Sequence, residues 1–215
     1  ANLFYAKNAG MIAFAALIAY NLTVRKKPNK KWLTGLTGIF IISAVFINLL
    51  PSDSKNQSVV LACIHLPLML WCLYGIVYIR FDFRDTGRRV SFIRHNGDMA
   101  ILGALILLSG MLLAGLSIGL FASIEIEIQK FVMEYIAICG VVAAPAITEF
   151  ILHHYPKLTE KIAPVLASIF TPIVLITLVI YLIAVIFSGK DPYTDRDFLI
   201  LFNLMLLVVM ALIVF

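Results

Sequence analysis

Seven stretches of about twenty apolar residues, separated by polar segments, dominate this sequence. A bilayer core is about 30 Å thick, and a helix needs about 20 residues to cross it. Inside lipid the backbone polar groups must bond within each stretch, so we expect helices. The expected helices are residues 2–24, 32–50, 58–79, 99–121, 128–153, 162–187 and 198–215. The sequence therefore predicts an all-α integral membrane protein, a single polytopic bundle of about seven transmembrane helices.

The composition supports the membrane class. The chain is 62% hydrophobic and 13% charged, whereas an ordinary soluble domain carries about 25% charged residues. The sequence begins with Ala1 and ends at Phe215 inside an apolar run. We expect it to be a segment of a longer protein, incomplete at both ends.

Lysine and arginine are distributed unevenly between alternate polar segments. Twelve lie in or beside residues 25–31, 80–98 and 154–161. The other five, on the opposite side of the expected membrane, are Lys7, Lys55, Lys130, Lys190 and Arg196. Cytoplasmic loops carry an excess of these residues. The pattern predicts that those three loops lie in the cytoplasm, and the lipid bilayer is the main partner expected of such a chain.

Glu149 is the strongest functional candidate, because an ionisable group at bilayer depth is costly and often functional. It follows Pro145, which can kink its helix, and the next helix contains Pro172. Broken neighbouring helices form ion sites in transporters. The alternative is that Glu149 extends to the membrane interface and pairs with Lys157 or Lys161.

Two histidines are further ion or proton candidates. His153 lies four residues after Glu149 and so on the same helix face. His65 lies within the third apolar stretch, with no second histidine at matching depth to complete a haem site. A metal site needs three or four ligands within reach, and no such spacing is present, so we expect no metal and no cofactor.

An acidic segment, SGKDPYTDRDF at 188–198, contains Asp191, Asp195 and Asp197. Thr194 and Asp197 match a helix-capping box. The segment is interpreted either as a turn with a helix cap or as an outer-loop cation or substrate site.

A basic segment, FDFRDTGRRVSFIRHNGD at 81–98, contains Arg84, Arg88, Arg89 and Arg94. Its mixture of arginine and phenylalanine is typical of a segment lying at the membrane interface, in contact with lipid headgroups or a protein partner. Asp98 is expected to cap the helix that follows. The sequence lacks the interleaved aromatic and basic pattern of nucleic-acid-binding folds, so no nucleic-acid partner is expected.

Gly115 and Gly119 form a GxxxG motif in the fourth apolar stretch. Such motifs allow close helix packing. The contact is expected either within the chain or in a homo-oligomer.

Two functions remain open. The first is a transporter or permease-like protein with a proton or cation site near Glu149. The second is a non-transporting scaffold or sensor that acts through partner or lipid contacts. The sequence contains no GxSxG, HExxH, Walker or GxGxxG motif, and it gives no positive support for enzyme activity.

Three stretches together resemble a known family. They are RHNGDMAILGALILLSGM at 94–111, YIAICGVVAAPAI at 135–147 and GKDPYTDRDFLILFN at 189–203. The chain resembles the bacterial multi-pass inner-membrane family known as domain of unknown function 4153, in its Bacteroidetes-like form. The likeness covers residues 94–215 well and residues 1–93 loosely. It implies a bacterial inner membrane and a longer protein, and it implies no activity.

Overall fold

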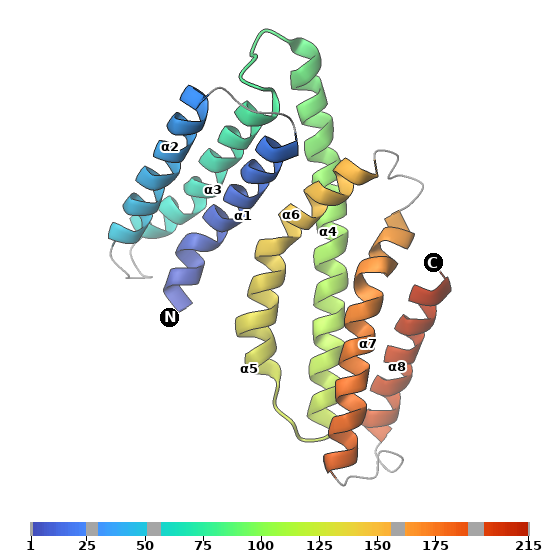
Figure 1. Cartoon of the computed structure of the whole chain (residues 1–215). Helices are drawn as coiled ribbons and strands as arrows, with labels where there is room; N and C mark the ends of the chain where they lie inside the picture. Colours follow the sequence, from blue (N-terminus) through green and yellow to red (C-terminus); the bar gives the residue numbers. More distant parts are fainter. Residues whose placement is uncertain (1, 25–29, 51–56, 156–161, 189–195, 215) are drawn as a thin grey trace. The chain divides into compact units, whose positions relative to one another are not determined.

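The structure, a computed structural model, describes residues 2–24, 30–50, 57–155, 162–188 and 196–214. These residues form helices joined by short turns, and no strand occurs among them (Figure 1). The helices are α1 (Asn2–Val24), α2 (Lys30–Leu49), α3 (Gln57–Tyr78), α4 (Thr86–Ser123), α5 (Gln129–Phe131), η1 (Val132–Ala137), α6 (Ile138–His154), α7 (Ile162–Ser188) and α8 (Arg196–Val214). Here α5, the π-helical η1 and α6 follow one another without a break. Pro145 lies inside α6 and Pro172 inside α7, so both helices continue through their prolines.

Five helical stretches in the described part of the chain are long and apolar enough to cross a membrane. They are Trp32–Leu49, Gln57–Tyr78, Thr86–Ser123, Gln129–His154 and Pro164–Phe187. This agrees with the all-α membrane class predicted from the sequence. The helices α1 and α8 are not among the five, so the count of seven spans stays a prediction.

The exposed apolar side chains are those of a lipid-facing protein. Leu49, Ile186 and Phe187 are each more than three-quarters exposed. Scattered apolar residues are normal on soluble proteins, but contiguous apolar surfaces mark contact with a membrane or another protein. In this chain such residues line most of the long helices.

The expected helix 99–121 begins earlier than predicted, at Thr86, and this corrects the interpretation of residues 86–98 as a loop. Asp85, not Asp98, caps the helix: its Oδ1 accepts a hydrogen bond of 3.2 Å from the backbone N–H of Arg88. The 38 residues of α4 extend for about 57 Å. That length exceeds the hydrocarbon core of about 30 Å, so a search for apolar runs finds only part of the helix.

The chain divides into two compact units. The first contains Ala1–Ile101 and Val142–Ile151, and the second contains Leu102–Val141 and Leu152–Phe215. The long helix α4 and the helix α6 contribute residues to both units.

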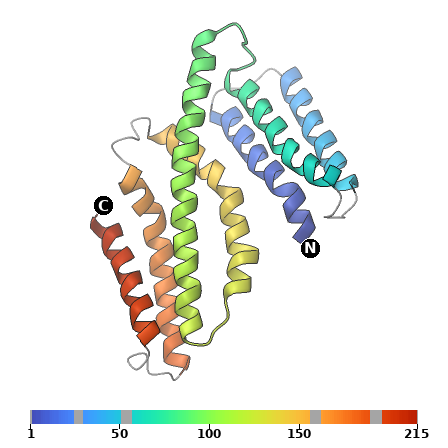
Figure 2. The same ribbon diagram turned by 180° about the vertical axis from the view of Figure 1, so that it is seen from behind.

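In the first unit α1, α2 and α3 lie side by side (Figure 1 and Figure 2). Its larger core cluster includes Leu17 and Ile18 from α1, Leu36 from α2 and Tyr74 from α3. Phe92 of α4 packs against this cluster. This core therefore holds four helices of the first unit around Tyr74.

In the second unit α7 and α8 lie side by side (Figure 1 and Figure 2). The rings of Phe121 in α4 and Tyr181 in α7 meet edge to face, with centroids 5.4 Å apart. A Cβ placed on Gly119 would lie 3.2 Å from the side chain of Leu201 in α8, whereas one on Gly115 meets nothing within 4 Å. Gly119 thus makes a close contact within the chain, and Gly115 remains exposed.

Candidate functional site

Glu149 is buried inside the first unit. The residue is 3% exposed, and it projects from the last part of α6. A glutamate that extended to the membrane interface would have its carboxylate in water. The alternative that Glu149 extends to the interface is therefore wrong. Its proposed partners Lys157 and Lys161 lie outside the described residues.

Three side chains from three other helices bond to the Glu149 carboxylate. Asn21 of α1 donates from Nδ2 to Oε1 at 2.7 Å. Tyr74 of α3 donates from its hydroxyl to Oε2 at 2.9 Å. The Nε2 atom of His95 in α4 lies 2.6 Å from the same Oε2. Both carboxylate oxygens therefore have partners, as a buried charge requires.

These three partners also contact one another. The Tyr74 hydroxyl lies 3.0 Å from Nε2 of His95, and Asn21 Nδ2 lies 3.4 Å from the same hydroxyl. A hydroxyl has one hydrogen to donate and two lone pairs that accept. Tyr74 can therefore donate to Glu149 while it accepts a hydrogen bond from a neighbour. The four side chains form one connected hydrogen-bond network, which we call the Glu149 cluster.

The short contact between His95 and Glu149 is compatible with two positions of one proton. A protonated Nε2 donates to an ionised carboxylate. Alternatively, a protonated carboxyl donates to a neutral Nε2, with the ring hydrogen on Nδ1. Both arrangements keep the same heavy-atom positions and leave Oε2 a lone pair for Tyr74. The pair can therefore hold and exchange a proton with little rearrangement.

One atom of the cluster still needs a donor. Asn21 is 2% exposed, and its Oδ1 is buried without a hydrogen-bond partner among the residues that the structure describes. The amide orientation follows from the network, because Nδ2 must face the carboxylate. A buried carbonyl without a partner is uncommon and costs free energy. It marks a position where a water molecule or a ligand with a donor group would be stabilised.

Aromatic rings pack around the imidazole of His95. The ring of Tyr78 stacks on it, with centroids 4.8 Å apart and planes 29° apart. Phe92 lies 5.3 Å from Tyr78 and 6.0 Å from Tyr74, measured between ring centroids. About one turn after Phe92 in α4, Asn96 accepts a hydrogen bond from the indole N–H of Trp71. These contacts hold the first part of α4 against α3 and so position His95.

The structure does not bring the other two predicted histidines to Glu149. His65 is exposed, and its Nδ1 lies 2.8 Å from the backbone oxygen of Leu61. His153 is exposed, and its ring meets that of His154 edge to face. The partner of Glu149 is His95, which the sequence analysis placed in a loop. Its position in a helix explains the error, because the extra turns of α4 carry His95 to the cluster.

The remaining candidates lie elsewhere. Asp191, Asp195 and the side chain of Asp197 fall outside the described residues, so the acidic-site hypothesis stays a prediction. Arg84 lies in the turn before α4, and Arg88, Arg89 and Arg94 lie on α4 itself. Within the described residues no three His, Cys, Asp or Glu side chains are close enough together to bind a metal ion.

Searches among protein-family models, curated proteins and solved structures find no match to the chain. The resemblance to domain of unknown function 4153 therefore stays a prediction. The fold and the site together define an α-helical protein of the membrane class with a buried carboxylate–imidazole pair.

Proposed function

We propose that this protein is a proton-coupled transporter of a bacterial inner membrane, and that Glu149 takes up and releases the coupled proton. The observation that carries the proposal is the buried contact of 2.6 Å between Glu149 and His95. Both groups change their charge when they gain or lose a proton, and carboxylate and histidine pairs of this kind carry protons in pumps and transporters.

A purely structural role does not readily explain why these polar residues are buried, because their burial costs free energy. Removing a carboxylate from water costs several kcal/mol, and a buried ion pair is often no more stabilising than apolar residues of the same size. The Asn21 carbonyl adds a further cost, because it lacks a donor among the described residues. Strained or costly polar groups of this kind are concentrated at functional sites.

The cluster also connects protonation to the packing of helices. Asn21, Tyr74 and His95 come from α1, α3 and α4, and all three bond to one carboxyl on α6. A change in the charge of Glu149 alters the strength of three hydrogen bonds at once. Such a change biases the packing of four helices, as alternating access in a transporter requires.

The Glu149 cluster lies near the helix ends that lead to the segments rich in lysine and arginine. Asn21, Tyr74 and Glu149 are each within about one and a half turns of the end of their helix. Those ends lead to the segments 25–31, 80–98 and 154–161, which the lysine and arginine distribution places in the cytoplasm. We therefore propose that Glu149 exchanges its proton with the cytoplasm. The resemblance of residues 94–215 to a bacterial inner-membrane family supports the same location.

The test is electrical. The protein is reconstituted into liposomes on a solid support, and currents are recorded when a panel of solutes is applied at several pH values. Wild type should give pH-dependent currents with at least one class of solute, and Glu149→Gln should abolish them. Glu134→Gln is the control, because Glu134 is a partly buried carboxylate in η1 and is not part of the Glu149 cluster.

Two results would contradict the proposal. One is an equal current in wild type and Glu149→Gln. The other is the absence of any proton-dependent current across the panel from folded wild-type protein. The second result would favour a non-transporting scaffold or sensor, in which the Glu149 cluster only fixes the helix packing.

A further inference from the structure

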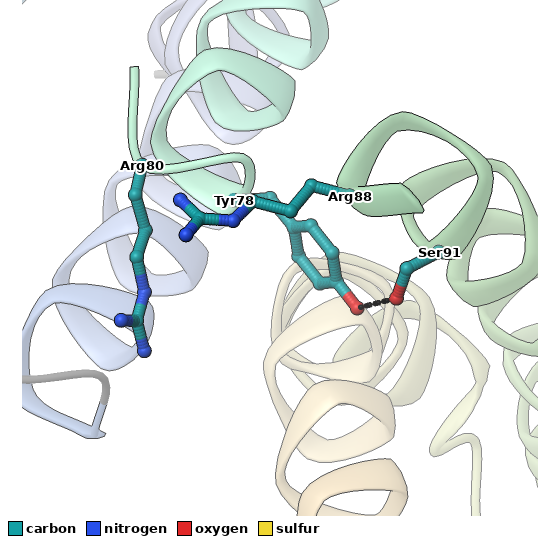
Figure 3. A pocket seen from close by; sticks show the side chains of 4 residues that line it. All are labelled: Tyr78, Arg80, Arg88 and Ser91. Carbon is teal, nitrogen blue, oxygen red and sulfur yellow. Dashed lines mark hydrogen bonds between the residues drawn. The ribbon is translucent and has the colours of Figure 1, made fainter. Parts of the chain in front are cut away.

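A second polar site lies in the first unit, where α3 ends and α4 begins. It is an open pocket of about 210 Å³ lined by Tyr78, Arg80, Arg88 and Ser91 (Figure 3). The hydroxyls of Tyr78 and Ser91 lie 3.4 Å apart. A water molecule takes up about 30 Å³ of liquid, so the pocket has room for a larger polar group. We call it the arginine pocket.

The backbone turn that presents Arg80 is unusual. Arg80 and Phe81 have φ angles of 57° and 58°, in the left-handed region that residues other than glycine rarely adopt. The backbone N–H groups of both residues bond to carbonyls of α3 at 3.0 Å. The ring of Phe81 stacks on Trp32, with centroids 4.2 Å apart. The backbone bonds to α3 and the ring contact with Trp32 hold the turn in place, and the turn sets the position from which the Arg80 side chain starts.

Arg88 is held in a defined orientation. Its Nε lies 2.9 Å from a carboxylate oxygen of Asp85, and its Nη1 lies 3.7 Å from Asp82. Nη1 also donates to the backbone oxygen of Ile79 at 3.4 Å. Among the described residues, neither Nη2 of Arg88 nor the guanidinium of Arg80 has a hydrogen bond or an ion pair. Each arginine therefore keeps donors for a ligand at this pocket.

The local charge favours an anion. Residues 80–89 contain four arginines and two aspartates. The aspartates lie against Arg88, and the segment as a whole keeps a net charge of +2, to which Arg84 and Arg89 contribute from outside the pocket lining. Guanidinium groups bind phosphate through paired hydrogen bonds, and hydroxyls can donate to the same oxygens. Carboxylates and sulfates have fewer or less basic oxygens for this set of donors.

We propose that the arginine pocket binds a phosphate group, with Arg80 and Arg88 supplying charge and the hydrogen-bonded pair of Ser91 and Tyr78 supplying one hydroxyl donor. The phosphate belongs either to the headgroup of an anionic phospholipid or to a soluble phosphate compound, because both present the same oxygens. The long apolar helices and the basic segment favour a position of the pocket near a membrane surface. Phospholipid headgroups and soluble phosphate compounds are both present there. This inference does not depend on the proton-coupled function proposed above.

The experiment uses the purified full chain in three forms, which are wild type, Arg80→Gln and Arg94→Gln. Arg80→Gln removes the charge, and because Gln keeps a Cβ it retains the same backbone strain. Arg94→Gln is the matched control: Arg94 is exposed on α4 and does not line the pocket. One arm measures the thermal stabilisation of each form by inorganic phosphate at constant ionic strength. The other arm measures, by native mass spectrometry, how much phosphatidylglycerol or phosphatidylcholine each form retains from mixed nanodiscs.

Wild type and Arg94→Gln should bind in at least one arm, and Arg80→Gln should bind about tenfold more weakly. Stabilisation by inorganic phosphate without selective lipid retention identifies a soluble phosphate compound. Selective retention of phosphatidylglycerol identifies a lipid headgroup. Equal binding by Arg80→Gln and Arg94→Gln, or no binding by wild type in either arm, would overturn the proposal.

Discussion

The carboxylate of Glu149 illustrates how a buried charge is stabilised by its neighbours. Burying an ion costs several kcal/mol, and a hydrogen bond to a charged group returns about 1.5–3 kcal/mol. Three such bonds, from Asn21, Tyr74 and His95, are of the right size to offset that cost. Asn21, Tyr74 and His95 in turn need Glu149 as a hydrogen-bond acceptor, because each of them is itself buried or largely buried.

Two substitutions of Glu149 separate the effect of losing its hydrogen-bond acceptors from the effect of losing its charge alone. Glu149→Ala leaves the buried donors of Asn21, Tyr74 and His95 without an acceptor, so we expect a loss of about 3–5 kcal/mol in the free energy of unfolding. Glu149→Gln keeps the shape and the acceptor for Asn21, and we expect a loss of about 1 kcal/mol. Thermal unfolding in the same detergent measures both. Equal losses from the two substitutions would show that the hydrogen bonds are not the stabilising feature.

The sequence identifies Glu149 but not its partners. A carboxylate in a long apolar run is visible without any structure. Its partners are 128, 75 and 54 residues away along the chain, and only the packing of the helices brings them together. A weak signal was present: Asn21 and Tyr74 are polar groups inside apolar runs, and polar side chains in lipid need internal partners.

At the scale of the helices, the contact between α3 and α4 controls the position of His95. A Cβ on Gly75 would lie 2.8 Å from two ring atoms of Phe92. The ring therefore packs directly on the backbone of α3, which only a glycine permits. Phe92 in turn lies against Tyr74 and Tyr78. Small residues that let helices approach are common in membrane proteins, and here the approach serves the Glu149 cluster.

Two glycine-to-alanine substitutions test this contact. Gly75→Ala forces the Phe92 ring to move, and we expect a loss of about 1–3 kcal/mol in unfolding free energy. Gly97→Ala is the control, because Gly97 is exposed on α4 and a Cβ there meets nothing within 4 Å. It should raise stability by about 0.5–1 kcal/mol through its helix propensity. Unfolding in one detergent compares the two, and a Gly75→Ala protein as stable as Gly97→Ala would contradict this packing.

Most of the helices lie where the apolar runs predicted them, and the main exception has a physical reason. A helix of a membrane protein can extend beyond the hydrocarbon, where water and charged side chains surround it. Residues 86–98 contain arginines and a histidine as well as Val90 and Phe92, so a search for apolar runs excludes them. The capping aspartate, Asp85, was the local signal for the true start of α4.

At the scale of the whole molecule, the described helices form two compact units, and α4 contributes to both. The membrane class rests on five long apolar stretches and on the many apolar side chains at the surface. The two candidate sites, the Glu149 cluster and the arginine pocket, both lie in the first unit. Tyr78 of the arginine pocket contacts both sites: its hydroxyl faces Ser91, and its ring stacks on His95 of the Glu149 cluster.

Cysteine labelling tests how α4 lies in the membrane. Val90 and Leu108 are similarly exposed on the protein, at 58% and 60%, but only Leu108 lies in the long apolar run of α4. In a background without Cys63, Cys72 and Cys139, a membrane-impermeant maleimide should label Val90→Cys from the cytoplasmic side and should not label Leu108→Cys. Equal labelling of both positions would contradict a membrane-embedded α4, and labelling of Val90→Cys from the outside only would reverse the orientation.

The central claim is that the buried Glu149 carboxyl exchanges a proton with water while the protein stays folded. Infrared difference spectra, recorded as the pH of reconstituted protein is changed across its range of stability, measure this directly. We predict a carbonyl stretching band of a protonated carboxyl that appears as the pH falls, is lost in Glu149→Gln and persists in Glu134→Gln. The absence of any band that depends on Glu149 would show that its protonation does not change, and the claim would be wrong.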